Sequence, residues 1–169
     1  MTNAWEALLK DYVDGVAVLR READLERTFT THCQRLLRSA GSSAVVLNQD
    51  QQPGKKVDVR LGSDDELALV ELKLYHDEAD WKETKTMKNT VESDLIFAEG
   101  KANVWVGIID TIPSVHRQQL RFELPWTRVV LPTNVFDEFY QNANPPSGWP
   151  RERIQGAALI NGGQLKTDS

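Results

Sequence analysis

The sequence predicts a single domain of the α/β class, and the order of its hydrophobic patterns carries this prediction. Apolar residues recur first at helical spacing, then at the spacing of strands, then again at helical spacing, and finally in a short apolar run. A chain of 169 residues that is 40% apolar has enough material for one core. We therefore expect one domain over 1–169, with its core at about 20–110 and C-terminal additions at about 111–169.

Two helices are expected before the first strand. Residues 5–19 repeat apolar side chains at helical spacing, and Asn3 is a candidate N-cap. A second helix is expected over 21–40, where Gly41 offers a natural stop. Cys33 lies on the apolar stripe of this helix, so we interpret it as a small core residue rather than a nucleophile.

Short strands follow, expected at 43–47, 56–61 and 67–74. Residues 48–54 have turn chemistry, which predicts a tight connection between the first two strands. A long helix is expected over 77–99 and a strand covered on both faces at 104–109. Because a helix separates these last strands, the pattern indicates a three-strand meander and then a crossover to a fourth strand. Weaker patterns predict strands at 117–124, 127–131 and 154–160 and a short helix at 135–140.

Composition excludes several classes of protein. The 20 basic and 25 acidic side chains give a net charge of −5, which argues against a general basic coat for nucleic acid. The single cysteine excludes an intramolecular disulfide and a cysteine-rich zinc site, and the three histidines lack the spacing of a zinc hydrolase. The sequence shows neither an apolar run of membrane-spanning length nor a secretory signal pattern at its start, so we expect a cytoplasmic protein with no membrane partner.

The strand at 67–74 places charges where a core strand is normally apolar. One face carries Ala68, Val70, Leu72 and Leu74, and the other carries Leu67, Leu69, Glu71 and Lys73. Burial of an unpaired charge costs several kcal/mol, so Glu71 and Lys73 are expected to share one polar site. They lie two residues apart on a strand and therefore point the same way.

Two further acidic positions could join this site. Asp58 lies on the preceding strand, and an antiparallel hairpin turning at 62–66 would bring it near Glu71. Glu22 and Glu26 share a face of the second helix with its apolar stripe, and that face must dock on the sheet. A glutamate on a docking face is costly unless it has a cation to bind.

This arrangement resembles the PD-(D/E)XK nuclease superfamily, which has the restriction-endonuclease-like fold. Asp58, preceded by Val57, stands where that family has its first acidic residue, and Glu71, Leu72 and Lys73 stand as its E-x-K motif. The glutamate of the first core helix corresponds to Glu26 or Glu22. The resemblance covers about 20–110 and implies a three-layer α/β core of helix, three-strand meander, crossover helix and fourth strand, with C-terminal additions.

The resemblance also implies the chemistry. Asp58, Glu71, Glu26 and the Leu72 carbonyl would be ligands for Mg²⁺ or Mn²⁺, for which oxygen donors are suited. Lys73 would orient or deprotonate a water molecule and stabilise the negative charge that develops on a phosphate. The expected reaction is hydrolysis of a phosphodiester bond, with Glu26, Asp58, Glu71 and Lys73 as the catalytic residues.

Nucleic acid is the expected partner, and DNA is favoured over RNA. Basic residues that could contact phosphates are Lys55, Lys56, Arg60, Lys82, Lys85 and Lys88. Because this set is small, binding is expected to be modest and sensitive to salt. The resemblance also allows a homodimer or a larger assembly, in which a partner would supply the remaining contact surface.

Two other interpretations remain open. The chain could use a nuclease fold as a non-catalytic binding or regulatory module, since a fold does not guarantee its chemistry. Alternatively, E-x-K could be accidental in an α/β domain of another fold, with Glu71 and Lys73 on a solvated face far from Asp58. The positions of the carboxylates of residues 26, 58 and 71 distinguish these interpretations.

Overall fold

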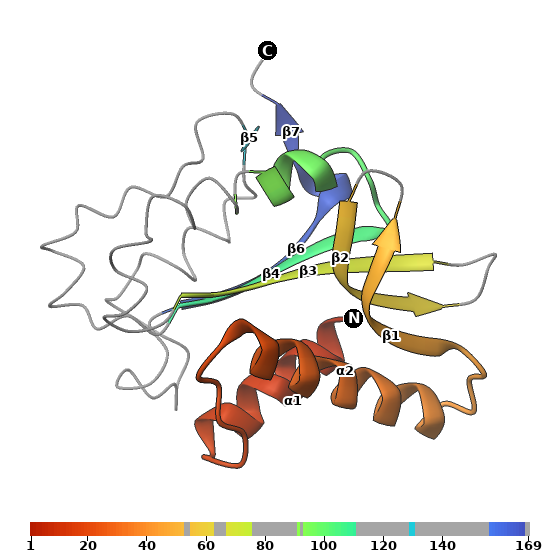
Figure 1. Ribbon diagram of the computed structural model, residues 1–169, viewed down its shortest axis with the longest axis vertical. Helices are drawn as coiled ribbons and strands as arrows, with labels where there is room; N and C mark the ends of the chain where they lie inside the picture. Colours follow the sequence, from red (N-terminus) through yellow and green to blue (C-terminus); the bar gives the residue numbers. More distant parts are fainter. Residues whose placement is uncertain are drawn as a thin grey trace, which may run out of the picture.

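A five-stranded mixed sheet with helices on both faces forms the centre of the structure, a computed structural model (Figure 1). The structure describes residues 1–52, 55–62, 67–75, 91, 93–110, 129–130 and 156–167. The strand order of the sheet is β1-β2-β3-β4-β6, and a separate pair is formed by β5 and β7. The prediction of an α/β fold is confirmed at this level.

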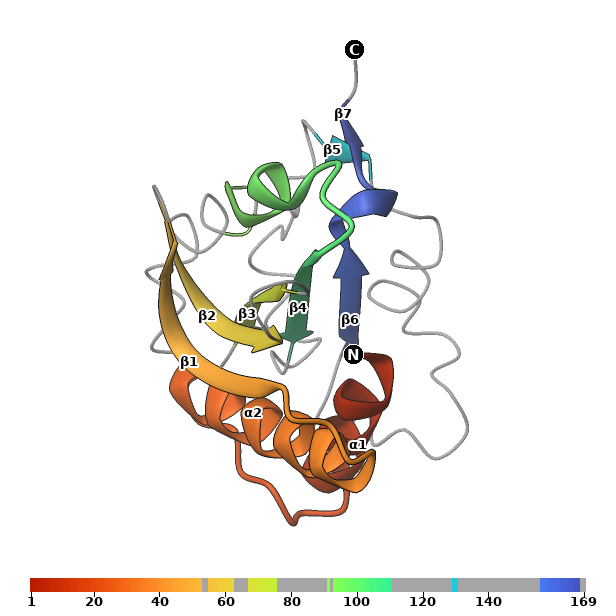
Figure 2. The same ribbon diagram turned by 90° about the vertical axis from the view of Figure 1, so that its right-hand side faces the viewer.

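Helices α1 (Thr2–Val13) and α2 (Glu22–Ser39) lie together on one face of the sheet (Figures 1 and 2). The prediction of Asn3 as N-cap is wrong, because α1 already begins at Thr2 and Met1 is its cap. At the start of α2, the Asp24 carboxylate accepts hydrogen bonds from the backbone N–H groups of Arg20 and Arg21. The predicted stop at Gly41 is confirmed, since this residue follows the C-cap Ala40 and has a φ of 67°.

Strands β1 (Val45–Gln52), β2 (Lys55–Gly62) and β3 (Leu67–Tyr75) form the predicted antiparallel meander. The predicted turn at 48–54 is wrong over most of its length, because β1 continues through Gln52. Its backbone pairs with β2 from Val45–Gly62 to Gln52–Lys55. The backbone ladder therefore overrides the low strand preference of the polar residues at 48–52.

The fourth strand of the sheet is parallel to β3, as the predicted crossover requires. This strand is β4 (Val104–Asp110), and residues 93–98 of the predicted crossover helix are helical. Strand β6 (Gly156–Asn161) pairs antiparallel with the other side of β4. Strand β6 covers most of the strand predicted at 154–160, and it joins the central sheet at the side of β4.

The remaining C-terminal elements are short. Strand β5 (Val129–Val130) covers two residues of the strand predicted at 127–131, and it pairs with β7 (Lys166–Thr167). A single 3₁₀ turn, η2 (Gly162–Gln164), connects β6 to β7. The strand predicted at 117–124, the helix at 135–140 and most of the helix at 77–99 lie outside the described residues.

Each face of the sheet has its own hydrophobic core. Val70, Leu72 and Leu74 of β3 pack against α1 and α2, whereas Leu69 packs on the other face against Leu95 of the 93–98 helix. This alternation confirms the predicted two-faced strand. Cys33 is buried with the α2 core, and burial raises the pKa of its thiol to about 12, so it is protonated at neutral pH.

Strand β2 changes the core to which it contributes at Asp58. Val59 belongs to the core beneath α1 and α2, but Val57 belongs to the core beneath the 93–98 helix. Side chains two residues apart on a regular strand point to the same face, so Val57 and Val59 depart from that alternation. Figure 2 shows β1 and β2 curving away from the flatter part of the sheet. Asp58, the residue at which the strand changes face, belongs to the candidate site.

Among the described residues, no helix is long and apolar enough to cross a membrane.

We predict that Gly162→Ala destabilises the fold by about 3 kcal/mol, because a methyl group there would overlap backbone rather than a movable side chain. It would collide with the Ala98 carbonyl oxygen and lie 2.7 Å from that of Lys101. Urea unfolding followed by circular dichroism measures the change. The neighbouring Gly163→Ala should cost less, because its nearest backbone contact would be 3.2 Å away. Equal stability of the two variants would contradict this packing argument.

Candidate metal centre

The candidate site forms where the backbone ladder between β2 and β3 ends. The last paired residues are Val59 and Val70, so Asp58 is not paired with Glu71. In a regular antiparallel ladder, the next hydrogen-bonding groups of β3 would meet the backbone of β2. At Leu72 the backbone groups of β3 meet side chains instead of a neighbouring strand. Charged groups therefore lie inside the sheet.

Two side chains satisfy the backbone of Leu72 at this opening. The Leu72 N–H donates to Asp58 Oδ2 over 2.7 Å, and the Leu72 carbonyl accepts from Lys73 Nζ over 3.1 Å. Both backbone groups of a strand residue face the same neighbour, so Asp58 and Lys73 together replace the missing strand. A buried backbone group without a partner is costly, which explains why a carboxylate and an ammonium occupy this position.

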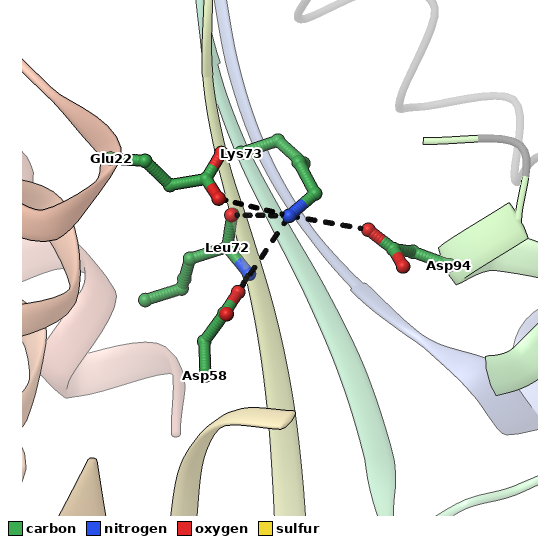
Figure 3. A network of polar contacts seen from close by, with 5 residues as sticks. All are labelled: Glu22, Asp58, Leu72, Lys73 and Asp94. Atoms are coloured by element: carbon green, nitrogen blue, oxygen red, sulfur yellow. Dashed lines mark hydrogen bonds and ion pairs between the residues drawn. The ribbon is translucent and has the colours of Figure 1, made fainter. Parts of the chain in front are cut away.

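The Lys73 ammonium lies among oxygens from four elements. Besides the Leu72 carbonyl, it contacts Glu22 Oε1 of α2 at 3.1 Å, Asp94 Oδ2 at 3.4 Å and Asp58 Oδ2 at 3.8 Å. Figure 3 shows Glu22 approaching from the α2 side and Asp94 from the opposite side, with Nζ between them. The side chain of Lys73 is only 8% exposed, so this is an interior ion-pair network.

Electrostatics keep Lys73 charged despite its burial. Burial alone would lower the pKa of the ammonium, but Asp94, Asp58 and Glu22 together outweigh burial and raise it above its ordinary value. The pKa of Glu22 is also raised, mainly by burial and further by the charges of Asp58 and Glu26, while Lys73 acts in the opposite direction. At neutral pH, Lys73 is therefore a hydrogen-bond donor.

Three carboxylates converge beside this ammonium. One oxygen each from Glu22, Glu26 and Asp58 lies within 4.8 Å of the other two. Glu22 and Glu26 are one helical turn apart in α2, so both reach the same point on the sheet. Glu22 lies in the first turn of α2, where the backbone N–H groups favour negative charge.

The predicted site residues are thus partly brought together. Glu26, Asp58, Leu72 and Lys73 lie at the opening between β2 and β3, and Glu71 is buried on β3 with 2% of its surface exposed. Glu71 is not one of the three clustered carboxylates, whose third member is Glu22. A role of Glu71 as a metal ligand remains a prediction.

Asp94 is the residue of this network whose role the sequence did not define. The sequence places Asp94 beside Val91 and Leu95 on the predicted helix and leaves two interpretations: it reaches the site or, as is favoured, it packs as a partner for a lysine on the N-terminal side. The structure places its carboxylate 3.4 Å from the Lys73 ammonium, so its partner is a lysine that belongs to the site. A carboxylate on the apolar face of the predicted helix was the available signal.

The predicted phosphate contacts lie mostly beyond what the structure describes. Arg60 is half-buried in β2. The backbone of Lys55 and Lys56 belongs to β2, but the positions of their side chains are not described. Lys82, Lys85 and Lys88 lie outside the described residues. The nucleic-acid surface therefore remains a prediction.

Comparisons with protein-family models, curated proteins and solved structures find no match to this chain. What the site can do is therefore argued from its own geometry.

We predict that Lys73→Met destabilises the protein by about 2–3 kcal/mol at pH 7, because it leaves buried carboxylates without their ammonium. Chemical unfolding measures this loss. Because the folded-state pKa of Lys73 is raised, its stabilisation is complete below pH 10.5 and disappears as pH rises through the folded value. The difference between wild type and variant should therefore shrink above pH 10.5.

The matched control for this prediction is Lys10→Met. Lys10 also pairs with a carboxylate, that of Asp14, but on the exposed surface of the molecule. Solvent screens such a pair, so its removal should leave stability unchanged within error. A loss at Lys10 equal to that at Lys73 would show that burial does not control the effect.

Proposed function

We propose that the protein is a metal-dependent nuclease that hydrolyses phosphodiester bonds, with DNA favoured as substrate. The observation that carries the proposal is the convergence of Glu22, Glu26 and Asp58 within 4.8 Å of one another, beside the Lys73 ammonium. The order of helix, antiparallel meander and parallel crossover supports a restriction-endonuclease-like core. This finer description of the fold is part of the proposal.

The oxygen donors fit a hard divalent cation such as Mg²⁺ or Mn²⁺. Magnesium–oxygen distances are about 2.0–2.1 Å, so two oxygens on opposite sides of the ion lie about 4.2 Å apart. One oxygen of each of the three carboxylates lies within 4.8 Å of the other two, which is close to this span. Glu22, Glu26 and Asp58 would hold the ion, with Glu71 and the Leu72 carbonyl as further donors from β3. A bound ion would lower the pKa of water and polarise a phosphate.

The residues of the chain then have separate roles. Lys73 is protonated, so it serves as a donor to the charge that develops on the phosphate, and a role as general base is disfavoured. Asp58 fixes the opening by accepting the Leu72 N–H, which keeps the Leu72 carbonyl directed at the site. Burial of Lys73 and Glu71 keeps bulk water away and strengthens these electrostatic effects.

Phosphate contacts and assembly belong to the same proposal. The candidate contacts are Lys55, Lys56, Arg60, Lys82, Lys85 and Lys88. The net charge of −5 predicts weak binding away from the site, so specificity would require a second copy or another partner.

A non-catalytic module with the same core is the alternative, and one observation favours it. Lys73 already supplies a cation to the carboxylates, with contacts at 3.1 Å to Glu22 and 3.8 Å to Asp58. Such a network could hold α2 to the sheet without any metal. The two functions differ in whether a divalent cation binds and whether cleavage depends on it.

We predict that the wild-type protein binds Mn²⁺ and cleaves DNA only when Mn²⁺ or Mg²⁺ is present. Calorimetry measures binding, and gel assays with single- and double-stranded DNA and RNA measure cleavage. Asp58→Asn should lose both properties, because it removes a central carboxylate. Lys73→Met should lower cleavage at least about 100-fold while Mn²⁺ still binds, because it removes only the donor.

Glu6→Gln is the control, since it removes one negative charge from an exposed position on α1. It should leave both Mn²⁺ binding and cleavage unchanged. Mn²⁺ binding without cleavage of any substrate would support the non-catalytic alternative. Absence of Mn²⁺ binding as well would reject the metal-centre proposal.

A further inference from the structure

The oxygens around Lys73 divide into two groups. Glu22, Asp58 and the Leu72 carbonyl belong to the donor set of the proposed metal centre, and they lie 3.1–3.8 Å from Nζ. The Asp94 carboxylate lies 3.4 Å from Nζ and approaches from the opposite side (Figure 3). It is not one of the three clustered carboxylates. The inference below rests on the proposed function.

An ammonium and a divalent cation compete when they share the same oxygens. Two cations a few ångströms apart repel strongly in a partly buried place, so binding of one weakens binding of the other. Lys73 therefore opposes metal binding unless another acceptor holds its ammonium. Asp94 is suited to be that acceptor, because its side chain is only 4% exposed and solvent screens its attraction for Lys73 little.

We propose that Asp94 is a positioning residue that accepts the Lys73 ammonium when a divalent cation takes Glu22 and Asp58, and so lets the two cations share the site. Asp94 acts through Lys73 in this role and needs no contact with the metal. Through Asp94, the 93–98 helix then contributes to the site as well as to the core. The attraction also keeps Lys73 near the carboxylates, where its charge is useful to the reaction.

The test is a double-mutant cycle on Mn²⁺ affinity, measured by calorimetry on wild type, Asp94→Asn, Lys73→Met and the double variant. Asp94→Asn alone should weaken Mn²⁺ binding about tenfold, because, of the carboxylates in contact with Lys73, only Glu22 and Asp58 then remain to hold its ammonium. In the Lys73→Met background, the same substitution should change affinity less than about twofold. This coupling distinguishes positioning from a purely structural role.

Two further variants complete the experiment. Asp94→Glu keeps a carboxylate and should retain most of the wild-type affinity. If Asp94→Asn does not fold, Asp94→Glu takes its place in the cycle. It should then weaken Mn²⁺ binding slightly while Lys73 is present, and it should have no effect in the Lys73→Met background. Glu6→Gln controls for the loss of one negative charge and should not change Mn²⁺ affinity.

The outcomes separate this inference from the proposed function. Equal weakening by Asp94→Asn in both backgrounds would show that Asp94 acts on the ion directly and would overturn the positioning role, while the metal centre stands. No weakening in either background would overturn it too. Failure of all four proteins to bind Mn²⁺ would overturn the proposed metal centre and this inference together.

Discussion

The rest of the site depends on the ion pairs of the Lys73 ammonium. It joins α2 through Glu22, β2 through Asp58 and the 93–98 helix through Asp94, so one charged group connects both helical layers with the sheet. Removal of an ammonium from water is costly, and only several carboxylates together can offset that cost. Here three carboxylates lie within 3.8 Å of Nζ, and their charges raise the pKa of Lys73 despite its burial. The polar network is therefore a structural element as well as a candidate for chemistry.

This network exists because the sheet opens at Leu72. If β2 continued to pair with β3, the backbone of β2 would occupy the place of the Asp58 and Lys73 side chains. The transfer of β2 from one core to the other between Val57 and Val59 ends the pairing, and Asp58 lies at that point. The same local change thus exposes a carbonyl, provides a carboxylate to satisfy the N–H beside it, and creates space for α2 to insert Glu22. The same local change in β2 therefore accounts for both the opening of the sheet and the geometry of the candidate site.

The sequence predicted the parts of this arrangement that depend on local periodicity. Alternation along β3 placed Glu71 and Lys73 on one face of the strand and Leu72 on the other. Helical spacing placed Glu22 and Glu26 on one face of α2. The extension of β1 through Gln52 was not predicted, because it depends on pairing with β2 and not on the residues themselves. The contact between Asp94 and Lys73 joins positions 21 residues apart through a crossover. Local patterns contain no information about how such a helix is oriented.

The charges in this network bear on how well Lys73 balances the carboxylates around it. Glu22, Glu26, Asp58 and Asp94 contribute four negative charges when ionised, and Lys73 contributes one positive charge, which leaves these five groups at −3. At Glu22, burial raises the carboxyl pKa, Lys73 at 3.1 Å lowers it, and the charges of Asp58 and Glu26 raise it by smaller amounts. Asp58 and Glu26 thus repel Glu22, and a divalent cation among these three carboxylates would relieve that repulsion. A link between α2 and the sheet needs Glu22 and Lys73 alone, so the convergence of Glu26 and Asp58 with Glu22 is the feature for which the proposed metal centre accounts.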